Sequence, residues 1–135
     1  MFSQDDLMGS WRLVAFKETS NGVTKDTFGP NPQGQIQYSP EGRMSAMLMH
    51  KDYPTTTGDG RFNPDVPFLS YAGDFVVDGK HVIHNVDIAS QPFFVGQNLR
   101  RVISFDGDQL TLKSEVDNLN GIEIPVQTLV WQRAG

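Results

Sequence analysis

The chain has no cysteine, no long apolar segment and no cluster of lysine or arginine. The lack of cysteine excludes disulfides, a thiolate nucleophile and cysteine-ligated metals, and it is typical of a reducing compartment. No apolar run approaches membrane-spanning length, and the acidic residues 1–6 lack the basic and apolar parts of a secretory signal. A formal net charge of −5 with scattered signs disfavours nucleic acids and anionic membranes as partners. We expect a cytoplasmic protein without membrane insertion, with a secreted protein that has lost its leader as the alternative.

What is present is a series of short runs in which apolar and polar residues alternate. This pattern is typical of half-buried β-strands. Ser3, followed three residues later by Asp6, predicts a short helical turn over residues 3–8 before the first strand. At 135 residues we expect a single domain, residues 1–135. The eight predicted strands are residues 9–18, 33–39, 43–50, 67–77, 80–90, 97–105, 109–116 and 122–133.

The connections between these strands alternate in length. Residues 39–42, Asp78-Gly79 and Asp106-Gly107 are tight turns, whereas the connections between them are long. Successive connections of an up-and-down antiparallel sheet lie at opposite ends, so all long loops are expected at one end, where binding groups usually lie. Closing eight strands removes the sheet edges and leaves room for side chains or one small ligand. We therefore predict an all-β fold, a closed antiparallel up-and-down barrel of about eight strands, open at the loop end. The long loops are residues 19–32, 50–67, 91–96 and 117–121.

The first Asp-Gly turn predicts which side chains face the interior. A type I′ turn at Asp78-Gly79 would place Phe75 opposite Val82, Gly73 opposite His84 and Tyr71 opposite Val86. His84 would then face inward, on the same face as Ile88, whereas His81 would face outward.

The second Asp-Gly turn gives a matching prediction for the next hairpin. Asp106-Gly107 would place Ile103 opposite Leu110 and Arg101 opposite Leu112. Arg101 would then face the interior, and its neighbour Arg100 would face solvent.

Several segments, in order along nearly the whole chain, resemble the lipocalin-like domain family, a bacterial and fungal group of calycin-type barrels. In the calycin pattern, a G-x-W tryptophan plugs the closed end of the barrel and a basic residue of the last strand packs across it. The matching segments are residues 9–14 (GSWRLV), 38–46 (YSPEGRMSA), 71–73 (YAG), 77–79 (VDG), 84–87 (HNVD), Arg101, 106–108 (DGD) and 129–131 (LVW), with Trp11 and Arg133 in the plug positions.

The resemblance implies a barrel of eight to ten strands with an internal cavity. It also implies a link to cofactor-free enzymes of natural-product biosynthesis, which fold or isomerise polyketide- or terpenoid-like substrates. One departure concerns residues 50–67, where family members often have a long helix rich in alanine and glutamate. Here this stretch is rich in Pro, Gly and Thr and cannot form a long helix.

Three inward residues are candidates for catalysis. His84 can act as an acid or a base, or it can be a structural histidine bonded within the wall. Arg101 has no acidic neighbour on its predicted face, so its guanidinium would pair with a ligand oxygen or with a carboxylate of a distant strand. Tyr71 can donate to a developing oxyanion or can simply line the cavity.

A further set of side chains is predicted to contact an apolar ligand or to pack in the core and on the rim. Trp11 and Arg133 are expected to be structural, and His81 and His84, three apart on a strand, cannot bind one metal together. No metal and no cofactor is expected, and haem on His84 is the weaker alternative. The predicted ligand-binding residues are Phe28, Tyr38, Met44, Leu48, Phe62, Phe75, Val86, Phe93, Phe94 and Leu99.

The residues leave three hypotheses for function. The first is cofactor-free acid–base isomerisation, cyclisation or dehydration of a small, mostly apolar, oxygen-bearing organic molecule, with His84 moving the proton and Tyr71 and Arg101 holding the oxygen. The second is a non-catalytic carrier or sensor for a small hydrophobic or aromatic ligand. The third is a filled barrel with an interaction surface on its loops. The protein is expected to be a monomer or a homodimer.

Overall fold

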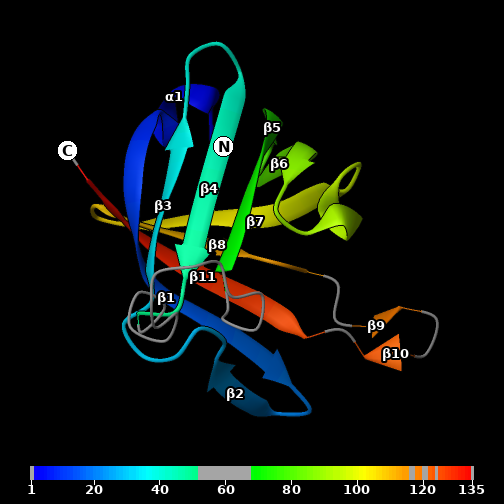
Figure 1. Cartoon of the computed structure of the whole chain (residues 1–135). Coiled ribbons are helices and arrows are strands. Elements are labelled where there is room, and N and C mark those ends of the chain that lie inside the picture. Colours follow the sequence, from blue (N-terminus) through cyan, green and yellow to red (C-terminus); the bar gives the residue numbers. More distant parts are fainter. Residues whose placement is uncertain (1, 52–67, 116–117, 120–121, 124, 135) are drawn as a thin grey trace, which may run out of the picture.

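The computed structural model describes residues 2–51, 68–115, 118–119, 122–123 and 125–134. A short helix leads into a series of strands, with one 3₁₀ turn between the sixth and seventh (Figure 1). The elements are α1 (Gln4–Leu7), β1 (Gly9–Ser20), β2 (Val23–Asp26), β3 (Gln33–Tyr38), β4 (Arg43–Met49), β5 (Phe68–Asp78), β6 (His81–Ala89), η1 (Pro92–Phe94), β7 (Asn98–Asp106), β8 (Gln109–Lys113), β9 (Asn118–Leu119), β10 (Ile122–Glu123) and β11 (Val126–Arg133).

The main sheet is an antiparallel barrel in which sequence neighbours pair. Its strand order is β11-β8-β7-β6-β5-β4-β3-β1-β2, and additional pairing of β11 with β1 closes it. The first half of β1 pairs with β3 and the second half with β2, so β2 extends the wall as an extra strand. The prediction of an all-β closed barrel of eight strands with one short helical turn at the N-terminus is confirmed. No helix among the described residues is long and apolar enough to span a membrane.

The structure differs from the predicted strands at the loop end. The predicted long link at residues 19–32 contains β2, which forms a hairpin with β1. The seventh predicted strand ends early, at Lys113. The predicted last strand, 122–133, is divided: β11 begins at Val126, whereas β10 pairs with β9 in a separate ribbon, set off to one side in Figure 1. Most of the predicted loop 50–67 lies outside the described residues.

The two Asp-Gly hairpins are present, but their predicted register was wrong by two residues. Phe75 lies opposite His84 instead of Val82, because Asp78 pairs with His81 and the turn residues are Gly79 and Lys80. Gly79 has a φ of 65°, and Lys80 is not among the residues with positive φ. Positive φ at the first central residue alone fits a type II′ turn better than type I′.

The second hairpin shifts in the same way, with Ile103 opposite Leu112 and Phe105 opposite Leu110. Because side chains alternate with a period of two, a two-residue slip leaves every side chain on its predicted face. The prediction that His84 and Arg101 face the interior is therefore correct although the predicted register was wrong.

An extra residue in β6 reverses the alternation beyond Val86. Gly73 pairs with Val86 and Ala72 with Ile88, which leaves Asp87 as the bulged residue. Ile88, predicted to face inward, is consequently 62% exposed. A β-carbon on Gly73 would lie 1.9 Å from the carbonyl oxygen of Asn85, so the close approach of the two strands requires glycine here.

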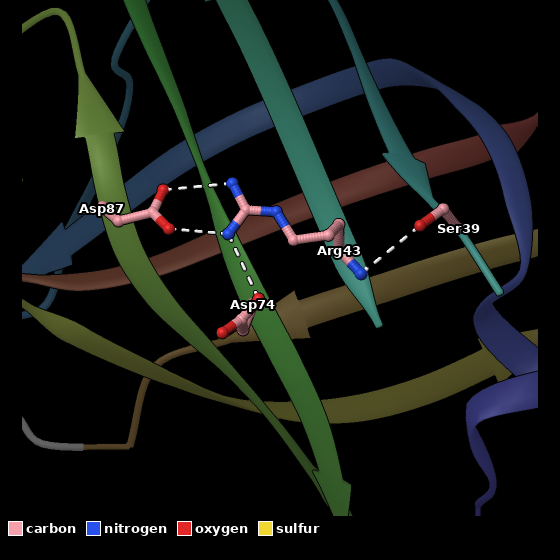
Figure 2. Close-up of polar contacts among 4 residues, drawn as sticks. All are labelled: Ser39, Arg43, Asp74 and Asp87. Atoms are coloured by element: carbon pink, nitrogen blue, oxygen red, sulfur yellow. Dashed lines mark hydrogen bonds and ion pairs between the residues drawn. The ribbon is translucent and has the colours of Figure 1, made fainter. Parts of the chain in front are cut away.

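On the outer wall, Arg43 of β4 reaches across β5 to the bulge (Figure 2). Its guanidinium donates to both carboxylate oxygens of Asp87, at 2.6 and 3.1 Å, and to Asp74 at 3.1 Å. A planar guanidinium matches a carboxylate in this two-bond geometry. The cluster thus ties β4, β5 and β6 together where the ladder is interrupted.

The closed end is plugged by Trp11, as the resemblance implied. The indole N–H of Trp11 donates to the carbonyl oxygen of Leu7, 3.0 Å away. The guanidinium carbon of Arg133 lies 4.0 Å from the centre of the Trp11 ring, and its nitrogens donate to the carbonyl oxygens of Met8 and Asp6. The last strand therefore holds α1 against the end of the barrel.

Candidate functional site

A small cavity lies inside the barrel, with a volume of about 40 Å³. Ligand pockets in proteins commonly reach about 300–1,000 Å³, so this cavity as it stands has room only for a small chemical group. Side chains would have to move to admit a larger ligand. The lining is mostly apolar, with a few polar side chains among them. The lining residues are Phe16, Ile36, Leu48, Leu69, Tyr71, His84, Phe94, Leu99, Arg101, Leu112, Gln127, Leu129 and Trp131.

His84 lies between two phenols. Its Nε2 is 2.7 Å from the hydroxyl oxygen of Tyr38, and its Nδ1 is 3.1 Å from that of Tyr71. The three rings come from β3, β5 and β6, and alternation in each strand turns them inward. His84 is 1% exposed and Tyr38 is 2% exposed, whereas Tyr71 is half-buried and lines the cavity. The side chains form a row that runs from the core, Tyr38–His84–Tyr71, to the cavity.

Burial keeps all three groups of this row uncharged at neutral pH. It lowers the pKa of His84 to about 3, and the nearby Arg101 cation lowers it further in the same direction. Burial raises the pKa of Tyr71 to about 12, against a smaller opposing effect of Arg101. The pKa of Tyr38 is also raised well above its ordinary value, first by burial. The hydrogen bonds of the row therefore join neutral side chains.

Arg101 brings a positive charge to the cavity wall. One guanidinium nitrogen donates to the side-chain oxygen of Gln127 at 3.1 Å, and another donates to the backbone carbonyl of Arg100 at 2.9 Å. Burial lowers the pKa of Arg101, but a guanidinium stays protonated in proteins. Within the described ranges, no carboxylate forms an ion pair with it. Among the described residues, the cation is thus held by neutral oxygens only.

Gln127 links Arg101 to the strand on the far side of β11. Its amide nitrogen donates to Glu18 of β1 at 3.4 Å, and Glu18 also accepts a hydrogen bond from Thr27 at 3.0 Å. This short network fixes the amide so that its oxygen faces Arg101. The orientation of the guanidinium is therefore set by β1 and β11 as well as by its own strand.

The structure brings the three predicted catalytic residues together. Tyr71, His84 and Arg101 all line the cavity, as do three of the predicted ligand-contact residues, Leu48, Phe94 and Leu99. Phe94 stacks against Tyr71 with ring centres 6.2 Å apart. Alternation along the strands was enough to find these positions, whereas η1 supplies Phe94 from a loop.

Other predicted contact residues lie away from the cavity lining. Phe93 is 68% exposed and stacks on Phe94, and Phe28 packs edge-on against Phe16. Phe62 lies outside the described residues. Tyr38, Met44, Phe75 and Val86 are buried in the wall and core.

Sequence reasoning missed several lining residues. Gln127, Leu129 and Trp131 alternate along β11, so their common face could have been found by the same period-two pattern. The last strand was predicted to begin at residue 122 and begins at Val126, but this difference does not change the alternation of the three residues. Ile36, Leu69 and Leu112 are likewise inward positions of predicted strands, and Phe16 belongs to the first strand.

His81 was predicted to face outward, and it does lie on the outer wall, but it is only 7% exposed. Its Nε2 contacts the carboxylate of Glu115, and its Nδ1 lies 3.2 Å from a guanidinium nitrogen of Arg100. These neighbours cover the ring. Over the part of the chain that the structure describes, no group of three histidine or acidic side chains is placed to hold a metal ion.

Comparison with known proteins agrees with the barrel and its plug. No curated protein matches the sequence. The family model for the lipocalin-like domain matches residues 8–134, which is nearly the whole chain and includes the plug, the cavity wall and the closing strand. The chain therefore belongs to the lipocalin-like domain family.

Proposed function

We propose that the barrel binds a small, mostly apolar organic molecule whose oxygen is held by Arg101 and Tyr71. The observation that carries this proposal is the guanidinium of Arg101, which faces an apolar cavity without a carboxylate partner among the described residues. A partly desolvated cation is stabilised by an anionic or strongly polar oxygen. Tyr71 lines the same cavity, and Phe94, Leu48 and Leu99 would contact the apolar part.

The activity that we propose for this site is cofactor-free isomerisation, cyclisation or dehydration. Arg101 and Tyr71 would stabilise negative charge that develops on a carbonyl or phenol oxygen of the substrate. His84 would act through Tyr71, because both of its ring nitrogens already have phenol partners. In a cavity from which water is largely excluded, fixed donors of this kind act more strongly than in solution.

A non-catalytic carrier or sensor is the second candidate, and the pKa values favour it. Protonating His84 works against a pKa lowered to about 3, and removing a proton from Tyr71 works against a pKa raised to about 12. A complete proton transfer through these residues is therefore costly. The site is better suited to holding or polarising an oxygen than to carrying a proton away.

Mass spectrometry of the protein under native conditions tests the binding proposal. We expect a small molecule to co-purify with the wild-type chain and to be lost in Arg101→Gln. Arg100→Gln is the matched control, because Arg100 contacts His81 on the outer wall and does not line the cavity. Equal retention of the molecule by both variants would contradict the proposal.

Incubation of the recovered molecule with fresh protein then distinguishes an enzyme from a non-catalytic carrier. Conversion by the wild type, together with loss of conversion but not of binding in His84→Ala, would support an enzyme. Recovery of the unchanged molecule would support a carrier.

A further inference from the structure

We propose that the described lining of the cavity offers a ligand mainly hydrogen-bond donors, so that it selects a ligand with a carboxylate, carbonyl or similar acceptor oxygen, and that Tyr38 sets this polarity without touching the ligand. The proposal deepens the function proposed above and rests on it, because it concerns the ligand of the same cavity. Three observations support it: the row of Tyr38, His84 and Tyr71, the indole of Trp131, and the hydrogen bond that each acceptor on the described polar lining side chains already accepts.

The direction of the hydrogen bonds in the row follows from the burial of Tyr38. Within the described residues its hydroxyl oxygen has a single partner, Nε2 of His84, and it is not part of the cavity lining. A buried hydroxyl proton without an acceptor is unfavourable. Tyr38 therefore donates its proton to Nε2, and Nε2 must be the unprotonated nitrogen of the neutral ring.

The other ring nitrogen then carries the proton. Nδ1 of His84 donates to the hydroxyl oxygen of Tyr71 at 3.1 Å. Since Tyr71 accepts this bond, its own proton is free to be donated to whatever occupies the cavity. In the opposite arrangement Tyr71 would donate to His84 and present only lone pairs to the cavity, and the buried proton of Tyr38 would have no acceptor.

Trp131 provides an independent observation. Its side chain lines the cavity and is 1% exposed, and its indole N–H has no hydrogen-bond partner among the described residues. An indole nitrogen can only donate. A cavity occupant that carries an acceptor oxygen is one way to satisfy this donor.

The acceptors of the polar lining side chains are already used. The oxygen of Gln127 accepts from Arg101, Nε2 of His84 accepts from Tyr38, and the oxygen of Tyr71 accepts from His84. The donor of Tyr71 and the charge of Arg101 remain for a ligand, and the donor of Trp131 has no partner among the described residues. On the described part of this lining, a ligand N–H or O–H group would therefore have to share an oxygen that already accepts a hydrogen bond.

Nuclear magnetic resonance of the ¹⁵N-labelled full chain tests the polarity directly. Each of the three histidines gives its own pair of ring-nitrogen signals, and His84→Gln identifies the pair of His84. We expect a protonated Nδ1 and an unprotonated Nε2 at neutral pH, with a preference on the order of tenfold or more. A protonated Nε2 would overturn the proposal.

Variants of the two phenols separate the role of Tyr38 from a merely structural one. In Tyr38→Phe the donor to Nε2 is lost, so we expect the preference for protonated Nδ1 to fall toward a mixture. In the matched control Tyr71→Phe the donation from Tyr38 remains, so the preference should persist. An unchanged preference in folded Tyr38→Phe would overturn the role of Tyr38, and the wild-type spectrum remains decisive for the polarity if this variant does not fold.

Acetate and acetamidine test the ligand class, because they have the same shape, opposite charge and opposite hydrogen-bonding character, and both suit a small cavity. We expect acetate to shift the indole N–H signal of Trp131, and acetamidine to leave it unchanged at equal ionic strength. Trp11 is the internal reference, since its N–H is already bonded to Leu7. Acetate affinity should fall on the order of fivefold in Tyr38→Phe.

The outcomes distinguish this inference from the function on which it rests. Binding of acetamidine in preference to acetate would overturn the proposed donor character of the cavity while supporting a binding function. If neither probe perturbs a cavity signal, the proposed binding function is contradicted, and the protonation of His84 still decides the direction of the row.

Discussion

Asp87, the bulged residue of β6, accepts two hydrogen bonds from the guanidinium of Arg43, which lies two strands away on β4. The pair bridges the outer wall where the ladder between β5 and β6 is interrupted (Figure 2). The bonds from Arg43 lower the pKa of the Asp87 carboxyl below its ordinary range. Both side chains are exposed to solvent, so the pair stabilises the fold only modestly.

The two-bond geometry predicts that charge alone will not replace Arg43. In Arg43→Lys the positive charge remains but the planar fork is lost, so we expect the pKa of Asp87 to rise toward its ordinary value. The measurement is a pH titration of the side-chain carboxyl signal by nuclear magnetic resonance. Asp74→Asn is the control, because it removes the other partner of Arg43, and it should leave Asp87 titrating low. A low pKa of Asp87 in Arg43→Lys would show that charge suffices.

Gly73 is predicted to be the most sensitive glycine of the barrel wall. Gly73→Ala would place its β-carbon 1.9 Å from the carbonyl oxygen of Asn85, so β5 and β6 would have to separate. We expect a loss of more than about 3 kcal/mol in the free energy of unfolding, measured with denaturant. Gly79→Ala is the control, because its β-carbon meets open space and only the positive φ is unfavourable, at about 1 kcal/mol. Equal losses would contradict the role of the close approach.

His84 predicts a pH dependence of stability. Its pKa is about 3 in the folded protein, whereas an unfolded histidine titrates near pH 6.5. Between these values the unfolded chain binds the additional proton, so stability is complete above about pH 6.5 and falls as the pH decreases toward 3. The slope from this one group reaches at most about 1.4 kcal/mol per pH unit.

Denaturant unfolding of wild type and His84→Gln at several pH values isolates this contribution. Glu115 and Asp87, whose pKa values are lowered, also reduce stability in acid, but they are present in both proteins. We expect a smaller slope between pH 6.5 and 4 in the variant. Parallel curves for the two proteins would mean that His84 already titrates in the folded state.

Arg133 is predicted to hold the plug of the closed end. Arg133→Gln removes the cation above the Trp11 ring and the bonds to two carbonyl oxygens of the N-terminal segment. We expect a loss of about 2 kcal/mol in unfolding free energy. Arg12→Gln, which changes an exposed arginine beside the plug, should alter stability by less than about 0.5 kcal/mol. Fluorescence of Trp11 should report loosening only in the first variant.

Much of the barrel could be predicted because alternation and tight turns are local signals. The alternation with a period of two predicted that His84 and Arg101 face the interior. The two-residue error in register at Asp78-Gly79 did not change this prediction, because a shift of two keeps each side chain on the same face. Ile88 was misplaced because the bulge at Asp87 depends on Gly73 of the neighbouring strand, which no local pattern records.

The polar row could be predicted only in part. Tyr38 was predicted to contact a ligand or to pack in the core, and it is buried, but its bond to His84 joins residues 46 positions apart. Such a contact depends on how far each strand is staggered around the barrel, which the sequence pattern does not set. The indole of Trp131, which has no hydrogen-bond partner among the described residues, was missed for the same reason.

The pairing of β1 with β11 has a consequence for how the chain is made. Trp11 lies opposite Arg133, so the seam of the barrel joins its first strand to its last, which is synthesised more than 100 residues later. Until β11 has been synthesised, the side of β1 that faces β11 has no strand to pair with, and such an edge favours association with other chains. Closing a ring across so much intervening sequence is also slow. We expect nascent chains truncated before β11 to depend on chaperones.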